Sequence, residues 1–300
     1  MTAPSGLIIV DKPSGMTSHD VVARIRKLAG TRRVGHAGTL DPMATGVLVI
    51  GVEKATRLLG YLTLTEKEYA ATIRLGQSTT TDDAEGEPSG GASARGVSRA
   101  ALDAEIARLT GEIMQVPPGV SAIKVNGQRA YKLTRAGAAP ELAARPVTVC
   151  EFRITRLTPA GDFLDVDATI RCSSGTYIRA LARDLGAALG TGGHLTALRR
   201  TAVGPYRLQQ AQTLADLSER TQLTPLAQAA AAAFPRLDLT AGDAWRLAHG
   251  ARIPVPASGP AVPDSQTPMA AFAPDGALVA LVTAESGQLR TLAVFASERD

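Results

Sequence analysis

Residues 35–46 read GHAGTLDPMATG, and the apolar run VLVIGV follows at residues 47–52. A short, β-branched run of this kind predicts a buried strand. The segment before it gathers glycine, proline, histidine and aspartate, which is typical of a loop that holds polar groups on a rigid scaffold. Taken alone, Asp41 could be a nucleophile or a base and His36 a base or a stacking partner, but the residues by themselves favour an ordinary turn at Asp41-Pro42. A metal site would need further ligands, so none is predicted.

The segments around this loop predict an α+β fold with a mixed sheet. Strands are expected at 7–10 and 69–75, and 147–157 should pair with 163–172 across a turn. The other expected elements are a helix opened by Ser18 and Asp20 that runs to about Leu28 before Gly30, a surface loop at 86–96, and helices at 101–109 and 176–189. Because several strands are hairpin neighbours, a mixed sheet is favoured over a doubly wound one.

Two further segments place polar residues at the ends of elements. Residues 172–181, CSSGTYIRAL, predict a strand end, a glycine turn and a helix with Arg179 on its first turn. That arginine could hold a phosphate or a carboxylate, or it could be a solvated helix residue. Residues 193–204, GHLTALRRTAVG, set Arg199 beside Arg200, a pair that suits an RNA backbone or solvent.

A composition shift near residues 227–233 predicts a domain boundary. The alanine-rich stretch ends at Phe234-Pro235, which divides the chain into residues 1–233 and 234–300. The second part should hold a helix opened by Thr240 and Asp243, then strands at 269–273, 278–283 and 289–295. A small β-barrel-like module fits this pattern, with residues 258–268 as a proline- and serine-containing loop.

The composition is that of a folded globular protein. The chain has 300 residues, of which 45% are hydrophobic and 20% charged. No apolar run approaches the ~18 residues of a membrane helix, and the N-terminus lacks the apolar core of a signal peptide, so no membrane partner and a cytoplasmic location are predicted. Cys150 and Cys172 have no cysteine or histidine at ligand spacing, which predicts buried free thiols.

Positive charge gathers in two stretches although the formal net charge is only +4. Residues 24–33 hold five basic residues without an acid, and six arginines between 171 and 207 share their stretch with Asp184 alone. Two basic patches for nucleic acid and two solvated faces are about equally good interpretations. With 4% aromatic residues, any RNA contact would use a few placed rings, not a broad stacking platform.

In order and wording, these segments resemble the bacterial type of the TruB family of tRNA pseudouridine-55 synthases. The shared motifs are VDKPSG (10–15), GHAGTLDPMATG (35–46), KEY (67–69), TTTDDAEG (79–86), PP (117–118), SAIK (121–124), GTYIRAL (175–181) and LRRTAVGPY (198–206). Their common order over about two hundred residues makes chance a poor explanation. The tail resembles the family's small PUA-type RNA-binding module. Thr80 and Ser174 depart from the family pattern, and both are expected to lie outside the catalytic core.

The resemblance implies a pseudouridine synthase-like catalytic domain that isomerises uridine 55 in the T loop of tRNA without a cofactor. Asp41 would be the nucleophile, and Arg179 would pair with it and keep it ionised. Tyr69 would stack on the uracil and assist removal of the C5 proton. His36 would fill the vacancy left by the flipped base.

Further binding roles follow from the same resemblance. Tyr177 and Leu198 would wall the pocket and Lys12 would lie on its rim. A basic arm at about 121–137, with a turn at Asn126-Gly127, would close over the RNA. The implied partner is the T-arm stem-loop of tRNA, and a monomer without an obligatory protein partner is expected.

Three other functions fit parts of the pattern. An RNA-folding helper of the same fold would not need a catalytic pocket, and the presence of Asp41, Tyr69 and Arg179 argues against it. A guide-dependent synthase within an RNA–protein particle is disfavoured by the motif wording and the modest charge. A hydrolase that uses His36 with Asp41 lacks a matching nucleophile or metal set.

Overall fold

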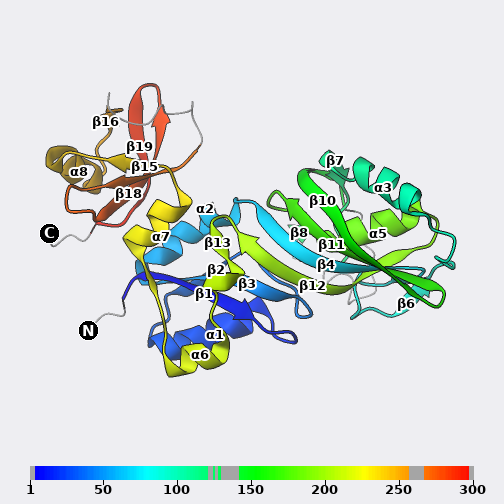
Figure 1. Ribbon diagram of the computed structural model, residues 1–300. Coiled ribbons are helices and arrows are strands. Elements are labelled where there is room, and N and C mark those ends of the chain that lie inside the picture. Colours follow the sequence, from blue (N-terminus) through cyan, green and yellow to red (C-terminus); the bar gives the residue numbers. More distant parts are fainter. Residues whose placement is uncertain (1–3, 121–123, 126–127, 130–141, 257–266, 297–300) are drawn as a thin grey trace.

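The computed structural model describes residues 4–120, 124–125, 128–129, 142–256 and 267–296 (Figure 1). The first elements are β1 (Gly6–Lys12), α1 (Ser18–Ala29), β2 (Val34–Ala37), β3 (Thr45–Val52), η1 (Glu53–Leu58), α2 (Leu59–Thr63), β4 (Lys67–Leu75), β5 (Ser78–Thr79), β6 (Pro88–Gly90), α3 (Arg99–Arg108) and β7 (Gly111–Gln115). The middle elements are β8 (Lys124–Val125), β9 (Gln128–Arg129), β10 (Arg145–Ala160), β11 (Phe163–Cys172), α5 (Ile178–Ala188), β12 (Gly193–Val203), β13 (Tyr206–Arg207) and η2 (Leu208–Gln210). The last are α6 (Leu214–Glu219), β14 (Thr224–Pro225), α7 (Leu226–Ala233), β15 (Arg236–Asp238), α8 (Ala241–Ala248), β16 (Ile253–Pro254), β17 (Met269–Phe272), β18 (Leu278–Glu285) and β19 (Gln288–Val294).

A long mixed sheet organises the larger part of the chain, as the sequence predicted. Its strand order is β14-β1-β3-β12-β4-β11-β10-β7, with β2 added to β3 and β13 to β12. The hairpin expected between residues 147–157 and 163–172 is confirmed as the antiparallel pair β10 and β11. Strand β12 is inserted between β3 and β4, antiparallel to β4 and parallel to β3. The segment that carries Arg199 and Arg200 is therefore a central strand.

A glycine makes the parallel contact between β3 and β12 possible. Gly46 pairs with Arg200 and has φ +99°. A Cβ atom at Gly46 would lie 2.2 Å from the carbonyl oxygen of Arg200, well inside van der Waals contact. Only glycine allows both this backbone conformation and this approach.

Side chains alternate across β4 and β11 and build the core beneath the sheet. On β4, Tyr69, Ala71, Ile73 and Leu75 are buried and the intervening residues are more exposed. Helix α5 packs against this face with the apolar side chains of Ile178, Leu181 and Leu185, among others, all within one continuous core. Burial of each such aliphatic side chain contributes about 1.5–3 kcal/mol. The same face carries the pocket described below.

Helix α1 begins one residue away from the predicted cap. Thr17, not Ser18, is the N-cap, and it forms a capping box with Asp20. The Ser18 hydroxyl instead accepts a hydrogen bond from the Leu40 backbone N–H at 2.9 Å, which ties the helix to the loop before β3. Gly30 ends the helix in the left-handed conformation with φ 63°, as predicted.

Smaller differences have local causes. The surface loop predicted at 86–96 contains the short strand β6, which pairs with β5. Cys172 is buried, but Cys150 is only half-buried, with its Sγ 3.3 Å from a Glu66 carboxylate oxygen. Most of the predicted basic arm at 121–137, including the turn at Asn126-Gly127, lies outside the described residues. The described strands β8 and β9 are paired antiparallel.

The C-terminal residues form a second sheet in the order β15-β17-β18-β19-β16, with α8 packed against it (Figure 1). Thr240 caps α8 as predicted. Phe272, Leu281 and Phe295 of this part share one apolar cluster with Leu58 of η1 and Ala229 of α7. The two sheets are thus joined by a common core. No helix in the described ranges is long and apolar enough to cross a membrane.

Candidate active site

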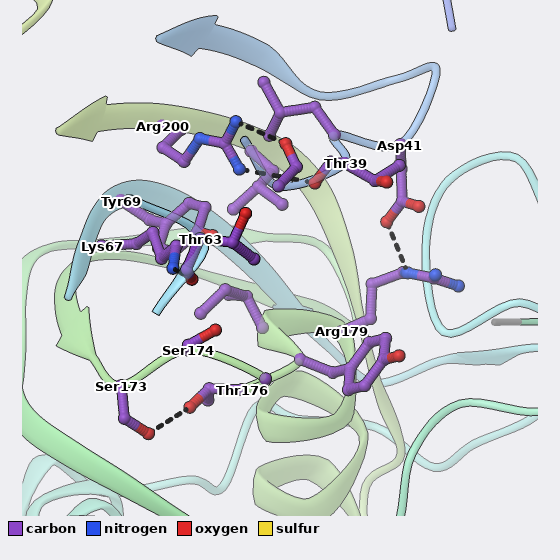
Figure 2. Close-up of a pocket in the computed structure, with 16 residues that line it drawn as sticks. Thr39, Asp41, Thr63, Lys67, Tyr69, Ser173, Ser174, Thr176, Arg179 and Arg200 are labelled. Carbon is purple, nitrogen blue, oxygen red and sulfur yellow. Dashed lines mark hydrogen bonds and ion pairs between the residues drawn. The ribbon is translucent and has the colours of Figure 1, made fainter. Parts of the chain in front are cut away.

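A cavity of about 310 Å³ opens where the loop after β2 meets the start of α5 (Figure 2). Its walls come from four parts of the chain that are distant in sequence. The lining residues are 38–41 of the loop, Thr63, Lys67, Tyr69, 173–179, Leu198 and Arg200. Among the described residues, no group of three histidine, cysteine or acidic side chains is arranged to hold a metal ion.

Asp41 stands on this cavity with its side chain 36% exposed. Its loop is fixed from below by backbone hydrogen bonds. The Gly15 N–H donates to the Pro42 carbonyl at 2.9 Å, and the Ala44 N–H donates to the Asp41 carbonyl at 3.1 Å. The DPMA turn therefore presents the carboxylate on a rigid support, and the turn and catalytic interpretations of Asp41-Pro42 are compatible.

Lys12 lies beneath the loop and does not line the cavity. It is fully buried. Its ammonium group donates to the carbonyls of Pro13 at 2.9 Å, Met16 at 2.6 Å and Pro42 at 3.1 Å. Burial lowers the pKa of Lys12 to about 8, although the Asp41 carboxylate opposes the shift. The predicted position on the pocket rim is wrong, because all three of its donors face the backbone that holds the loop.

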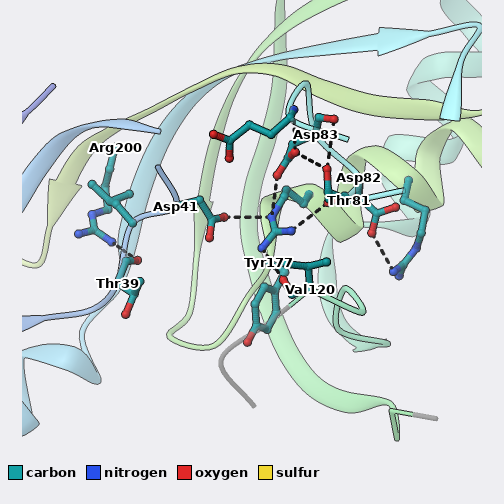
Figure 3. A network of polar contacts seen from close by, with 12 residues as sticks. Thr39, Asp41, Thr81, Asp82, Asp83, Val120, Tyr177 and Arg200 are labelled. Atoms are coloured by element: carbon teal, nitrogen blue, oxygen red, sulfur yellow. Dashed lines mark hydrogen bonds and ion pairs between the residues drawn. The ribbon is translucent and has the colours of Figure 1, made fainter. Parts of the chain in front are cut away.

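Arg179 approaches Asp41 from the first turn of α5, and the predicted pairing of the two is confirmed (Figure 2). Figure 3 shows the polar network around this contact, with Asp41, Asp83 and Val120 labelled. The Arg179 side chain is 5% exposed, and its Nε lies 3.0 Å from Asp41 Oδ2. This contact is an ion pair without hydrogen-bond alignment. The guanidinium is held by its other ends, where Nη1 donates to the Thr81 carbonyl at 2.9 Å and Nη2 to the Val120 carbonyl at 3.0 Å.

Arg179 also contacts a second carboxylate, that of Asp83, which the sequence did not predict. Asp83 Oδ2 lies 3.5 Å from Arg179 Nε, and Asp83 is buried. The Asp83 carboxylate also accepts hydrogen bonds from the Thr81 hydroxyl and from the Glu85 N–H. Asp83 lies in TTTDDAEG (79–86), one of the motifs that carry the family resemblance. No role was predicted for this residue. The buried Arg179 guanidinium thus forms ion pairs with the buried carboxylate of Asp83 and the solvent-accessible carboxylate of Asp41.

The tyrosine and leucine predicted to wall the pocket do line it. Tyr69 is 8% exposed, and burial raises the pKa of its phenol. Leu198 lies nearby on β12. Tyr177 is held through its backbone, because the Gln115 side chain accepts from its N–H at 2.8 Å and donates to its carbonyl at 3.1 Å. Gln115, at the end of β7, had no sequence signal.

His36 does not line the cavity, since it lies on β2 two residues before Gly38. Its ring packs edge-on against His19 with 5.5 Å between ring centroids. Burial lowers the pKa of His36, and the charges of His19 and Arg200 act in the same direction. Its role toward a flipped base stays a prediction.

Of the adjacent arginines predicted to meet RNA or solvent, Arg200 is buried, whereas the Arg199 side chain is 39% exposed. Arg200 is 1% exposed and donates to the carbonyls of Val47 at 2.7 Å and Gly38 at 3.0 Å. Arg199 forms an ion pair of 2.6 Å with Asp11. Ser174 was expected outside the core but lines the cavity. Arg200 is buried because it lies on a central strand, whereas Ser174 reaches the cavity from the segment between β11 and α5.

Comparisons with known proteins identify the family of this chain. The TruB family pseudouridylate synthase model for the N-terminal domain matches residues 26–178, and the two C-terminal models, for tRNA pseudouridine synthase II and tRNA pseudouridylate synthase B, match residues 234–296 and 179–230. The chain is 62% identical to tRNA pseudouridine synthase B of Thermobifida fusca (strain YX), over 97% of this chain and 98% of that protein. It is 59% identical to tRNA pseudouridine synthase B of Arthrobacter sp. (strain FB24), over 99% and 98%. The chain belongs to the TruB family.

Solved structures share the fold at lower identity. The crystal structure of a Cbf5-Nop10-Gar1 complex has a chain 28% identical, with a TM-score of 0.75 over 97% of this chain and 84% of that one. An H/ACA RNP bound to a substrate RNA containing 2'-deoxyuridine has a chain 27% identical, with a TM-score of 0.74 over 98% and 86%. The curated relatives are thus about twice as similar in sequence as these structures.

Proposed function

We propose that this protein isomerises uridine 55 in the T loop of tRNA to pseudouridine, with Asp41 as the nucleophile. The observation that carries the proposal is the Asp41 carboxylate, exposed to a cavity walled by Tyr69 and paired with the buried guanidinium of Arg179. The relatives named tRNA pseudouridine synthase B support tRNA as the substrate.

Each residue has a part in the isomerisation. The N1–C1′ bond of the uridine breaks, the uracil turns, and its C5 bonds to C1′. Arg179 places a guanidinium 3.0 Å from the Asp41 carboxylate and fixes the position of this nucleophile. The raised pKa of Tyr69 keeps its phenol protonated at neutral pH, so this residue stacks on the base and takes part in proton transfer as a neutral hydroxyl.

The target base must leave its stack to reach Asp41. The cavity is walled by Tyr69, Tyr177 and Leu198, which suits a planar base. We assign His36 the role of filling the space that the flipped base leaves in the RNA. His36 lies on β2, the strand before the Asp41 loop. Lys12 acts indirectly, by holding the backbone of Pro42.

The protein is proposed to act alone on the T arm, as a cytoplasmic monomer that needs no cofactor or obligatory protein partner. The higher identity to the synthases than to the chains of RNA–protein particles supports this assignment over a guide-dependent enzyme. The two-domain division at residue 233, with a C-terminal PUA-like module that contacts RNA, belongs to the same proposal. An RNA-folding helper would not need the Asp41–Arg179 pair.

The test is pseudouridine mapping of an unmodified tRNA transcript after incubation with the purified protein alone. A single modification at T-loop position 55 is expected. The same should be found with an isolated T-arm stem-loop, but not with an unstructured strand of equal composition. No pseudouridine in the transcript would refute the proposed activity, and equal modification of both short RNAs would refute recognition of a folded loop.

A further inference from the structure

Two buried cations at the floor of the pocket have no part in the roles above. Lys67 is 6% exposed, Arg200 is 1% exposed, and both line the cavity beside Tyr69 (Figure 2). Gly38 lies over both of them, since a Cβ atom built there would be 3.6 Å from Arg200 Nη1 and 3.9 Å from Lys67 Cε. Two positive charges therefore meet beneath the loop that carries Asp41.

The surroundings of the two cations leave their charge uncompensated. Across the described ranges, no carboxylate lies within ion-pair distance of either group. Their hydrogen-bond acceptors are backbone carbonyls and, for Arg200, also the Tyr69 hydroxyl. Lys67 Nζ donates to the carbonyls of Thr63 and Thr65 at the end of α2, which accounts for two of its three protons. No described group of the protein accepts the third.

Burial of these two positive charges costs free energy. Burial of a charge without a counter-charge is unfavourable, and like charges side by side add to the cost. The pKa of Lys67 is lowered to about 8, first by burial and then by Arg200. A site that tolerates such a cost is suited to a ligand that brings negative charge.

The proposed reaction supplies negative charge at this place. When the N1–C1′ bond breaks heterolytically, its electron pair stays on the uracil and spreads to O2 and O4. The uracil anion then turns and its C5 donates a pair to C1′, after which C5 loses its proton and N1 gains one. Negative charge also develops on the uracil carbonyl oxygens if Asp41 first adds to C6. Each path therefore requires stabilisation of negative charge on the uracil.

We propose that Lys67, together with Arg200, stabilises the uracil anion during the isomerisation, with Lys67 donating its third N–H to a uracil carbonyl oxygen. The assignment rests on the proposed function. Lys67 and Tyr69 are two residues apart on β4 and share one face of the strand, so the ring that stacks on the uracil and the ammonium group serve the same base. Fixed donors that meet developing charge in a dry site typically accelerate a step by about 10²–10³-fold.

Two substitutions test the charge. Lys67→Met removes it at similar length, and Lys67→Gln also removes it but keeps an amide that donates to the carbonyls of Thr63 and Thr65. Both variants are expected to lose about 100-fold in the single-turnover rate with a T-arm stem-loop, while the Kd for the RNA stays near the wild-type value. Lys54→Met is the matched control, because Lys54 also donates to a carbonyl, that of Phe295 at 3.0 Å, but lies outside the pocket.

A change of leaving group separates this role from a structural one. Uracil with fluorine at C5 is a weaker base, so its anion needs less stabilisation. With a 5-fluorouridine stem-loop, scored by disappearance of the starting nucleoside, the defect of both Lys67 variants should shrink to about 10-fold or less. A pH profile would not separate Lys67 from Lys12, because the pKa of each is lowered to about 8.

The outcomes are distinct. A wild-type rate in a folded Lys67→Gln protein would overturn the proposal, as would an equal loss on both substrates. If only Lys67→Met fails to fold, the glutamine variant decides. Absence of any reaction by the wild-type protein on a T-arm would instead refute the proposed function.

Discussion

Replacement of Arg179 by lysine should cost both activity and stability, although the charge is kept. The guanidinium serves Asp41, Asp83 and two backbone carbonyls, those of Thr81 and Val120. A lysine ammonium is a point donor on a flexible stem and cannot reach all four positions from one rotamer. The variant therefore leaves at least one carbonyl and the orientation of Asp41 unsupported.

The size of the effect follows from these contacts. Each hydrogen bond from a charged donor contributes about 1.5–3 kcal/mol, so the loss of one or two, partly offset by the ammonium, is expected to destabilise the fold by about 3 kcal/mol. At about 2–4 °C per kcal/mol for a protein of this size class, the Tm should fall by about 6–12 °C. The single-turnover rate should fall by about 100-fold or more, because the nucleophile loses its fixed orientation.

The assay is pseudouridine formation on a T-arm stem-loop under single-turnover conditions, at a temperature well below the Tm of the variant. Arg183→Lys is the matched control, since Arg183 lies one turn later on α5 and contacts Asp82 and the Val116 carbonyl outside the pocket. The control should keep a rate close to that of the wild type. A wild-type rate for Arg179→Lys, or an equal loss in the control, would refute the reasoning.

Three further results are expected. Asp41→Asn should abolish pseudouridine formation with little change in the Kd for tRNA, because phosphate contacts elsewhere dominate affinity; measurable turnover by the pure variant would contradict the assignment. Gly46→Ala should destabilise the protein by more than about 2 kcal/mol in denaturant unfolding, because the new Cβ would meet the Arg200 carbonyl at 2.2 Å; an unchanged midpoint would count against the strand contact. Arg246→Ala with Arg252→Ala should raise KM without lowering kcat and should reduce the salt dependence of tRNA binding, since both side chains are exposed and loosely paired at 3.8 Å; an unchanged salt series would remove the C-terminal sheet from the RNA contact.

Much of the fold was predictable because local patterns were strong. The alternation on β4 and β11, the Thr240 N-cap of α8 and Gly30 at the end of α1 each follow from a rule of local structure. The central position of β12 did not follow, because Gly193–Val203 mixes glycine, histidine and arginine with apolar residues, and only tertiary pairing makes this segment a strand.

The positions of site residues were predictable where a family motif contains the residue. Asp41 and Arg179 meet as expected, although 138 residues separate them, since the resemblance supplied a partner that no local rule could. Lys12, Arg200 and Ser174 were misplaced because burial and cavity lining depend on which strands become neighbours. Asp83 was overlooked since one acid in an acidic loop has no distinctive pattern.

The insertion of β12 between β3 and β4 sets an order of assembly during synthesis. Strand β3 pairs with β1 and β2, which precede it in the chain, whereas β4 pairs with β12 from Lys67 to Leu75 and lacks this partner until Gly193–Val203 has left the ribosome. At about 5–20 residues per second, the interval between the end of β4 and the start of β12 is roughly 6–24 s. Throughout that time the edge of β4 that β12 will cover faces water, which is the situation that favours edge-to-edge association of nascent chains. Chaperone dependence of this protein should therefore concentrate in nascent chains that end before β12.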